Sequence, residues 1–293
     1  MSTKGVAIVG LGEVLWDVFP DGPRFGGAPA NYACHAASLG ADAYMASAVG
    51  RDELGDRAMH SLQGLNVDTS CVQRNEYSTG AVHVQLDQEG KASYEFLANT
   101  AWDHIEWTDE LAELAARADA VCFGTLGQRS SKSAQTIRRF VESTPKSCMR
   151  IFDINLRPPF YADATILVSL AIANVLKLND DELPVVAKLC GSSGNACDIL
   201  QTLARRFDLG LVALTRGANG ALLVRGDEVT DHPGVKTSVI DTVGAGDAFT
   251  ATMTVGLLYG LDLAEITDYA SQVAAYVCSK AGATPRLPAN LLS

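Results

Sequence analysis

Short apolar runs alternate with segments of helical periodicity along most of this sequence, and this alternation restricts the possible folds more than any other feature. The apolar runs are typical of buried strands and occupy residues 6–9, 43–49, 120–123, 150–154, 175–178, 211–214 and 221–224. Most helical patterns lie between them, at residues 29–39, 54–65, 131–141, 180–189, 196–207, 245–259 and 263–280. Strands that alternate with helices form a largely parallel sheet covered on both faces. We therefore expect an α/β fold of three αβα layers with a mostly parallel central sheet.

One region departs from this alternation. Residues 80–96 read GAVHVQLDQEGKASYEF, two segments of period-2 alternation around a Gln-Glu-Gly-Lys turn, and this pattern predicts a β-hairpin. Residues 14–25 are extended and rich in turn residues, so they can join the hairpin in a small separate sheet. The sequence therefore predicts one domain over residues 1–293, with a lid formed by about 13–27 and 78–103.

The most informative segment is IDTVGAGDAF at residues 240–249, where a glycine-rich turn opens a long helical pattern. The first N–H groups of a helix are unpaired donors at the positive end of its dipole, and glycines let a ligand approach them closely. Gly244, Ala245 and Gly246 therefore form a candidate anion-binding turn. Asp247 would lie beside a bound phosphoryl group and could accept a hydroxyl proton. The alternative is that Asp247 is only a favourable first-turn acid.

Two signatures give this segment a context. DTVGAGDAF, residues 241–249, resembles the C-terminal signature of the ribokinase-like (PfkB) sugar kinases, and GGAPAN, residues 26–31, resembles their N-terminal signature. The resemblance covers essentially the whole chain. It implies the ribokinase-like fold and ATP-dependent phosphorylation of a sugar hydroxyl, with the glycine-rich turn stabilising the moving charge. Four segments between the signatures resemble bacterial fructokinase-like members in the same order, at residues 123–129, 152–157, 178–183 and 214–217.

The resemblance implies that the sugar is bound by GGAPAN and by an upstream carboxylate, which in this sequence is Asp17. Gly26 and Gly27 permit a close turn, and Asn31 offers both a donor and an acceptor to a sugar hydroxyl. Without this context, Asp17 could be a solvated turn residue and Asn31 an ordinary helix-turn residue.

Asn179 and Glu182 lie three residues apart at a predicted strand-to-helix junction, so both side chains share one face. In the family this NxxE pattern is implied to organise Mg²⁺ and the ATP phosphates, with Glu182 acting through water; the alternative is a helix cap. Arg157 is implied to contact the transferred phosphoryl group or the sugar, with Asn155 on the sugar side. The alternatives are a surface ion pair for Arg157 and a packing role for Asp153 and Asn155.

The nucleotide side of the site is implied by Thr215, Gly217 and Gly220, which precede the predicted strand 221–224. By themselves these residues indicate only a hairpin turn. Ser271 occupies a helix position where many relatives have Asn near the adenine, so the sequence departs from the family pattern there. A family site for a monovalent cation such as K⁺ is matched by Asp241 and the carbonyl group of Val243.

Other cofactor signals are incomplete. Gly10 and Gly12 follow the first predicted strand, but Leu15 stands where a dinucleotide fingerprint has its third glycine, and no GxxxxGK[ST] P-loop occurs. These absences argue against NAD and against P-loop chemistry. The histidines are scattered without metal-ligand spacing, at positions 35, 60, 83, 104 and 232.

The net charge of −11 would repel a nucleic acid backbone, and no Lys/Arg-rich run offsets it. A nucleotide can still bind, because a helix N-terminus, a few cations and Mg²⁺ neutralise phosphate locally. The seven cysteines include no CxxC pair, so we expect reduced core residues. With neither a signal-peptide pattern nor an apolar stretch of about 20 residues, we expect a cytoplasmic protein without a membrane partner.

Fructose is the expected acceptor, because GGAPAN and the DINLR segment resemble those of fructokinases, whereas 2-keto-3-deoxygluconate kinases tend to differ after the two glycines. Ribose and nucleosides are alternatives, because a few lid contacts decide among polyols. A non-catalytic sugar-sensing protein is less favoured, because Asp247 and its glycines are intact. The alternating hairpin would leave apolar residues on one face of the lid, which predicts a homodimer formed through the lids.

Overall fold

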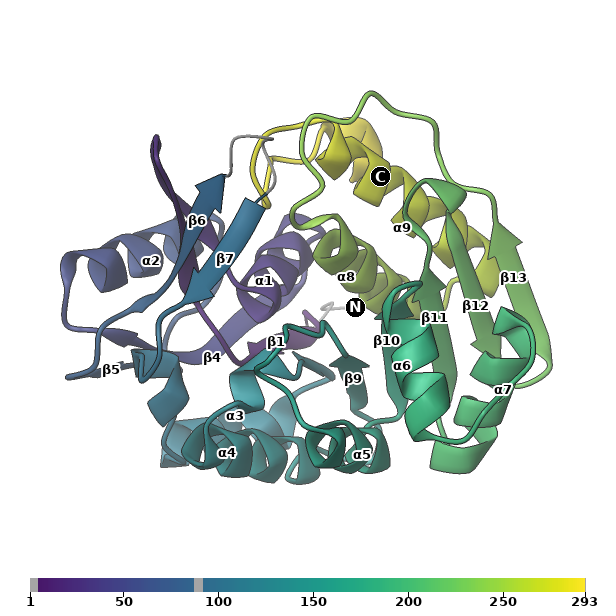
Figure 1. Cartoon of the computed structure of the whole chain (residues 1–293), viewed down its shortest axis with the longest axis horizontal. Helices are drawn as coiled ribbons and strands as arrows, with labels where there is room; N and C mark the ends of the chain where they lie inside the picture. Colours follow the sequence, from purple (N-terminus) through teal and green to yellow (C-terminus); the bar gives the residue numbers. More distant parts are fainter. Residues whose placement is uncertain (1–4, 87–91, 293) are drawn as a thin grey trace.

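The computed structural model describes residues 5–86 and 92–292, and its architecture is drawn in Figure 1. A large sheet runs in the order β13-β12-β11-β10-β9-β8-β1-β4-β5. Pairing is parallel from β11 through to β5, and antiparallel for β12 and β13 at the other edge. In spatial order the strands are β13 (Glu228–His232), β12 (Ala221–Arg225), β11 (Leu211–Thr215), β10 (Val175–Asn179), β9 (Met149–Asp153), β8 (Ala120–Phe123), β1 (Ala7–Leu11), β4 (Asp42–Gly50) and β5 (Val72–Asn75).

Helices cover both faces of this sheet, so the predicted three-layer αβα fold with a mostly parallel sheet is confirmed. One face carries α1 (Ala28–Ser38), α2 (Glu53–Gly64), α8 (Ala245–Leu258) and α9 (Leu263–Cys278). The other carries α3 (Asp109–Arg117), α4 (Ser131–Glu142), α5 (Asp163–Ile172), α6 (Glu182–Leu189) and α7 (Ala196–Phe207). Short 3-10 turns are η1 (Ala101–His104), η2 (Leu126–Gln128), η3 (Gly217–Asn219) and η4 (Ala289–Leu291).

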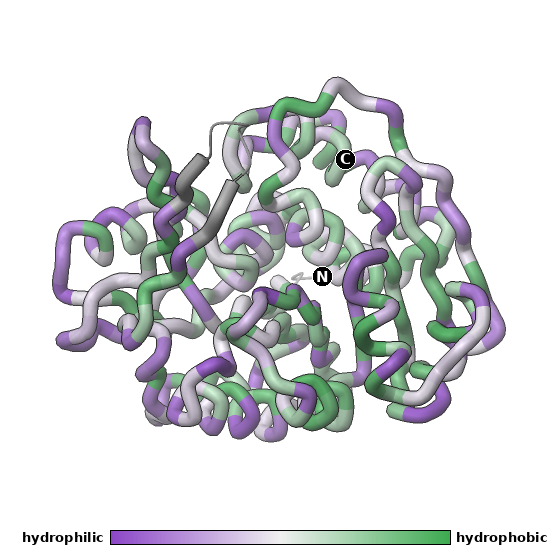
Figure 2. Tube along the Cα trace, viewed as in Figure 1, coloured by the Kyte–Doolittle hydropathy of each residue, from purple (hydrophilic) through white to green (hydrophobic). Residues whose placement is uncertain are grey.

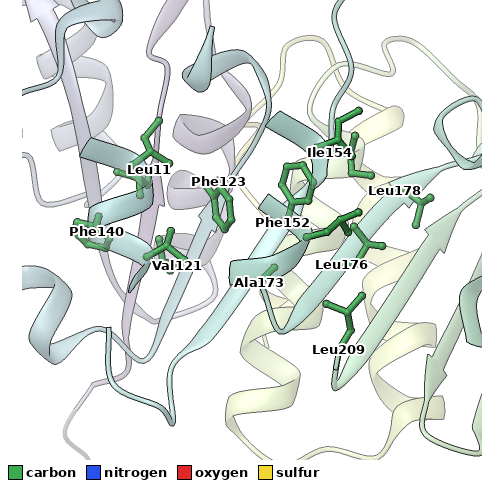
Figure 3. Packing of buried hydrophobic residues seen from close by; sticks show 14 of the residues in the cluster. Leu11, Val121, Phe123, Phe140, Phe152, Ile154, Ala173, Leu176, Leu178 and Leu209 are labelled. Carbon is green, nitrogen blue, oxygen red and sulfur yellow. The ribbon is translucent and has the colours of Figure 1, made fainter. Parts of the chain in front are cut away.

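The core is divided into two layers because successive residues of a strand point to opposite faces of the sheet. On β10, Leu176 and Leu178 pack with the α3–α7 layer, together with Phe152 of β9, as Figure 3 shows. Val175 packs in the opposite layer with α8 and α9, the layer toward which Lys177 is directed by the same alternation. Figure 2 shows the matching pattern, with apolar stretches along the central strands. Every apolar run expected from the sequence lies mainly on a strand of this sheet.

A second, smaller sheet stands beside α1 and has the order β3 (Gly22–Gly26), β2 (Leu15–Phe19), β6 (Gly80–Leu86) and β7 (Ala92–Phe96). β6 and β7 pair antiparallel, as the hairpin prediction requires, and β2 joins them by pairing parallel to β6. The turn expected at residues 88–91 lies outside the described residues. The small sheet contacts the main body through an apolar cluster of Leu15, Val82, Trp102 and Leu126. Its Phe96 ring also lies 5.1 Å from the ring of Phe160, measured between centroids.

No helix within residues 5–86 and 92–292 is long and apolar enough to cross a membrane. The seven cysteines all lie in this part of the chain, and none forms a disulfide there. Five of them are buried, in agreement with the expectation of reduced core residues.

Candidate active site

The first turn of α8 lies where the sequence predicted an anion-binding turn. Gly244 is the N-cap residue of α8 and has a left-handed backbone, with φ of 80°. A side chain at this position would overlap the carbonyl oxygen of Ala283, so glycine is required both by the backbone and by its neighbour. Ala245 and Gly246 follow as the first helical residues, where backbone amides have no partner within the helix itself; the Ala245 amide donates to the carbonyl oxygen of Thr242 at 3.3 Å.

Asp247 lies in this first turn and accepts a hydrogen bond of 2.8 Å from the side-chain amide of Asn31. Asn31 is a buried residue of α1, so the two family signatures meet at one contact. Burial among protein atoms raises the pKa of Asp247 to about 6, and the charge of Asp153 adds to the rise. The hydrogen bond from Asn31 and the charges of Lys177 and Arg157 act in the opposite direction. Asp247 is therefore mainly ionised at neutral pH and can accept a proton.

Asp17 lies on β2, opposite Arg24 of β3, with its carboxyl group against Gly26. Burial raises the pKa of Asp17 to about 6; the charge of Arg157 lowers this pKa and that of Asp241 raises it. The small sheet thus brings Asp17 within the electrostatic reach of Arg157 and Asp241, which lie in loops of the main body. Asn31 and Asp247, 216 positions apart in the sequence, are joined directly, and the charge of Arg157 acts on both Asp17 and Asp247.

Arg157 is exposed, and its guanidinium donates to the carbonyl oxygen of the adjacent Leu156 at 3.1 Å. Among the described residues it forms no ion pair, so the surface ion pair considered from the sequence is not present. Asn155, two residues earlier, has a left-handed backbone with φ of 46°. This conformation turns the chain sharply after β9 and leads to the Arg157 segment.

Asn179 and Glu182 form reciprocal hydrogen bonds at the start of α6, which is the helix-cap geometry. The Asn179 side chain accepts from the Glu182 amide at 2.9 Å, and Glu182 accepts from the Asn179 amide at 2.8 Å. The other oxygen of Glu182 accepts from the Leu156 amide at 2.8 Å, which fastens the Arg157 segment to α6. Burial raises the pKa of Glu182. Each carboxylate oxygen has room for a second hydrogen bond, so a water-mediated contact to Mg²⁺ is compatible with this cap.

The residues expected on the nucleotide side lie on two separate elements, the turn after β11 and helix α9. Thr215 ends β11, and the positive-φ glycines Gly217 and Gly220 shape the turn before β12. Ser271 is buried in α9, where its hydroxyl group donates to the carbonyl oxygen of Thr267 at 2.7 Å. This hydrogen bond within the helix satisfies the hydroxyl donor of Ser271, so no ligand is needed to explain a serine at this position. The antiparallel β11–β12 pair agrees with the hairpin interpretation of the turn.

Asp241 joins two loops next to the first turn of α8. One of its oxygens accepts from the amide of Val243 at 3.0 Å, and the other accepts from the amide of Gly282 at 3.1 Å. His35 of α1 approaches the adjacent residue, with its Nε2 2.9 Å from the Ala283 carbonyl oxygen. The loop that precedes Asp247 is therefore held by the segment after α9, which His35 of α1 contacts in turn. Within residues 5–86 and 92–292 no cluster of three or more His, Cys, Asp or Glu side chains could hold a metal.

Two buried ionisable residues of the site were missed from the sequence. Lys177, in the middle of β10, forms a 3.0 Å ion pair with Asp153 at the end of β9. Glu13 follows β1 and is buried, and its Oε2 atom has no hydrogen-bond partner among the described residues. Burial raises the pKa of Glu13 to about 7, with a contribution from the charge of Asp247. A charged residue inside or directly after a buried apolar strand was the available signal for both.

A cleft of about 530 Å³ opens beside the Arg157 segment. It lies between the chain that follows β7 and the loops that follow β8 and β9. Its lining includes Asn99, Asp103, Arg129, Phe160 and Tyr161. The cleft therefore borders both the small sheet and the main body.

A three-layer αβα body with a small accessory sheet, and a carboxylate in the first turn of a glycine-capped helix at their junction, define a ribokinase-like carbohydrate kinase. The chain belongs to the pfkB family of carbohydrate kinases, whose family model matches residues 21–290. It is an ATP-dependent carbohydrate kinase.

Similar proteins span nearly the same length. An uncharacterized sugar kinase of Pyrococcus horikoshii is 30% identical over 272 residues, covering 89% of this chain and 83% of that protein. Fructokinase of Salmonella typhimurium is 31% identical over 264 residues, covering 86% of this chain and 83% of that protein. The crystal structure of the Pyrococcus sugar kinase in complex with ATP superposes with a TM-score of 0.80 at 28% identity, covering 95% and 94% of the two chains.

Proposed function

We propose that this chain transfers the γ-phosphoryl group of ATP to a hydroxyl group of fructose, with Asp247 as the general base. The observation that carries the proposal is the 2.8 Å hydrogen bond between Asn31 and Asp247, because it joins a sugar-side residue to a carboxylate beside the anion-binding turn. A base in this position lies close both to the sugar hydroxyl and to the phosphoryl group that the hydroxyl attacks.

In the proposed reaction, Asp247 accepts the proton of the sugar hydroxyl while the hydroxyl oxygen attacks the γ-phosphorus atom of ATP. The bond from that phosphorus to the β,γ-bridging oxygen breaks, and ADP leaves. The amides of Gly244, Ala245 and Gly246 stabilise the negative charge that gathers on the phosphoryl oxygens. The hydrogen bond from Asn31 holds the Asp247 carboxylate in place, which restricts its orientation before the proton is transferred. Catalysis of this kind consists mainly of positioning and electrostatic stabilisation.

For the acceptor, we propose that Asp17 accepts hydrogen bonds from adjacent sugar hydroxyls and that Asn31 makes a further contact. The Asn31 Oδ1 atom is buried without a partner among the described residues, so its acceptor capacity is unused. Gly26 and Gly27 would let the sugar approach the backbone, with Asn155 and Arg157 on its far side. Arg157 has no ion-pair partner in the described structure and is suited to an anionic phosphoryl group.

For the nucleotide, we propose contacts from Thr215, Gly217 and Gly220 and from Asn179, with a departure from the family pattern at Ser271. Mg²⁺ would be held by the phosphates and by water that Glu182 orients, in keeping with the unused lone pairs of that carboxylate. When bound, Mg²⁺ neutralises charge on the phosphates of ATP. A monovalent cation such as K⁺ would bind at Asp241 and the Val243 carbonyl group.

We further propose that the chain is one domain, 1–293, in which residues 13–27 and 78–103 act as a lid over the sugar. Closure would exclude water, which otherwise competes as a nucleophile. The rings of Phe96 and Phe160 form a contact about which such a lid could close. We propose a homodimer that assembles through the lids in the cytoplasm; a monomeric mass by light scattering at full activity would contradict this assembly.

Fructose is favoured over other acceptors because the similar proteins include a fructokinase at 31% identity. The test is an ADP-release screen of the purified protein with fructose, ribose, tagatose, 2-keto-3-deoxygluconate and nucleosides. We expect the highest kcat/KM with fructose. A higher value with another acceptor would reassign the substrate, and ADP release with none of them would favour the non-catalytic sugar-sensing alternative.

A further inference from the structure

A buried ion pair lies directly beneath the first turn of α8. Lys177 Nζ and Asp153 Oδ1 are 3.0 Å apart, and the two side chains are only 8% and 6% exposed. Lys177 projects from the sheet face opposite to Leu176 and Leu178, which are buried against the α3–α7 layer in Figure 3. The strand therefore directs this cation toward the layer that contains α8.

Hydrogen bonds fasten the pair to the α8 turn. The second oxygen of Asp153 accepts from the hydroxyl group of Thr250 at 3.0 Å, and the same hydroxyl group lies 2.9 Å from the carbonyl oxygen of Gly246. A Cβ atom placed on Gly246 would lie 3.1 Å from Lys177 Nζ, so the ammonium group touches this residue. The position of the cation is thus fixed relative to the amides that form the anion-binding turn.

The charges of several nearby acids act on Lys177. Burial alone would lower the pKa of Lys177, but the charges of Asp153, Glu182 and Asp247 outweigh it and raise this pKa. The side chain is therefore an ammonium ion at neutral pH. An ammonium group has three N–H donors, and Asp153 is the acceptor that the described part of the chain provides for one of them. The other two donors have no acceptor among these residues.

A second buried ion pair, between Arg129 and Asp103, serves as a comparison. Arg129 forms a two-point contact with Asp103, at 2.8 and 2.6 Å, and its guanidinium lies 4.0 Å from the centroid of the Trp102 ring. It also donates to the Leu97 carbonyl oxygen at 2.6 Å. These contacts tie the chain after β7 to the main body and involve no residue of α8. Buried ion pairs seldom add stability over apolar residues of similar size, so stability alone does not account for a lysine under α8.

We infer that Lys177 is a positioning residue of the phosphoryl-transfer reaction. Held by Asp153, its ammonium group lies beneath the first turn of α8, stabilises the negative charge that gathers there in the transition state, and keeps Asp247 ionised. The inference rests on the proposed role of Asp247 and extends it to the layer below. No residue of the sugar side is involved, so its effects belong to kcat rather than to sugar binding.

The test compares Lys177→Met, which keeps the length of the side chain without its charge, with Lys177→Met/Asp153→Asn, which removes both members of the pair. We expect Lys177→Met to lower kcat roughly a hundredfold, as loss of one transition-state donor does, with the acceptor KM changed less than about threefold. The acidic limb of its kcat–pH profile should move to higher pH, because Asp247 loses a neighbouring cation. In the double variant thermal stability and the acidic limb should return toward wild type, while kcat stays low.

Arg129→Met is the matched control, because it removes the cation of a buried pair that makes no hydrogen bond to α8 in the described structure. We expect it to lower the melting temperature without moving the acidic limb of the profile. Recovery of kcat in the double variant, or an acidic limb that does not move in Lys177→Met, would overturn the inference. All variants are assayed with whichever acceptor gives the fastest ADP release. A change of preferred acceptor then revises the proposed function without affecting this test.

Discussion

Asp247→Asn should remove catalysis and yet stabilise the fold at neutral pH. The folded protein raises the pKa of Asp247 from 3.8 to about 6. One pKa unit corresponds to about 1.4 kcal/mol, so the ionised carboxylate costs the folded state about 3 kcal/mol. Asparagine carries no charge and therefore avoids this cost. It also loses the favourable interaction of an acid with the helix dipole, about 0.3–1 kcal/mol, which leaves a net gain of about 2 kcal/mol in the free energy of unfolding.

The pH dependence of this gain has a definite sign. A carboxyl group whose folded pKa is raised destabilises the fold above that pKa and has no effect below its unfolded pKa. The stability gain of Asp247→Asn should therefore be complete above pH 6 and disappear as the pH falls toward 3.8. Asp52→Asn is a control of opposite sign. Burial of Asp52 acts against ionisation, but hydrogen bonds from Thr79 and Gly55 outweigh it and lower the pKa of this carboxyl group.

Thermal melts and ADP-release kinetics on the same samples test this prediction. We expect kcat to fall at least about a hundredfold, because the amide cannot accept the proton. We also expect the melting temperature at pH 8 to rise by about 3 °C, because the unfolding entropy of a 293-residue domain is about 0.6 kcal/mol per degree. Asp52→Asn should melt lower than wild type at pH 8. A folded Asp247→Asn protein that keeps more than about a tenth of kcat, or that melts lower than wild type at pH 8, would refute the reasoning.

Three further results are expected. Asp17→Ala should raise the acceptor KM about tenfold or more with little change in ATP affinity, because a hydrogen bond to a charged group contributes about 1.5–3 kcal/mol; loss of ATP binding with intact sugar binding would contradict this assignment. The value of kcat/KM should decline as the pH falls below about 6, where Asp17 and Asp247 become protonated, and a profile flat down to pH 5 would argue against both roles. Gly244→Ala should lower the melting temperature and kcat together, because the added methyl group overlaps the Ala283 carbonyl oxygen. Gly260→Ala is the control, since Gly260 also has a positive φ but has open space around it, and this variant should lower only the melting temperature.

Much of the fold could be predicted from the sequence because its central strands are buried on both faces and are therefore continuously apolar. β5 and β13 escaped this pattern, since each lies at an edge of the large sheet and is largely polar. Among the helices, α3 and α5 were not expected: α5 is apolar on most sides and has little periodic contrast, whereas α3 is a short helix of nine residues.

The candidate site was predictable where a residue type is constrained by the backbone, as at Gly244, or belongs to a signature, as at Asp247. Lys177 and Glu13 could not be assigned, because the charged groups near them, Asp153 for Lys177 and Asp247 for Glu13, lie on other elements and are brought near only by the fold. The reciprocal hydrogen bonds of Asn179 and Glu182 show a different limit, because here the contact is known and the role is still not decided. A helix cap and a metal-organising pair have the same spacing, and both fit the same geometry.

The small sheet is made by two separate excursions of the chain. β2 and β3 leave the body after β1 and return at α1, whereas β6 and β7 leave after β5 and return at η1. The parallel pairing of β2 with β6 joins the two excursions into one unit. Four backbone connections therefore join this unit to the main body, and the unit can make only those movements that all four connections permit together. A deletion of either excursion would leave the other with an unpaired edge, so the accessory sheet depends on both excursions together.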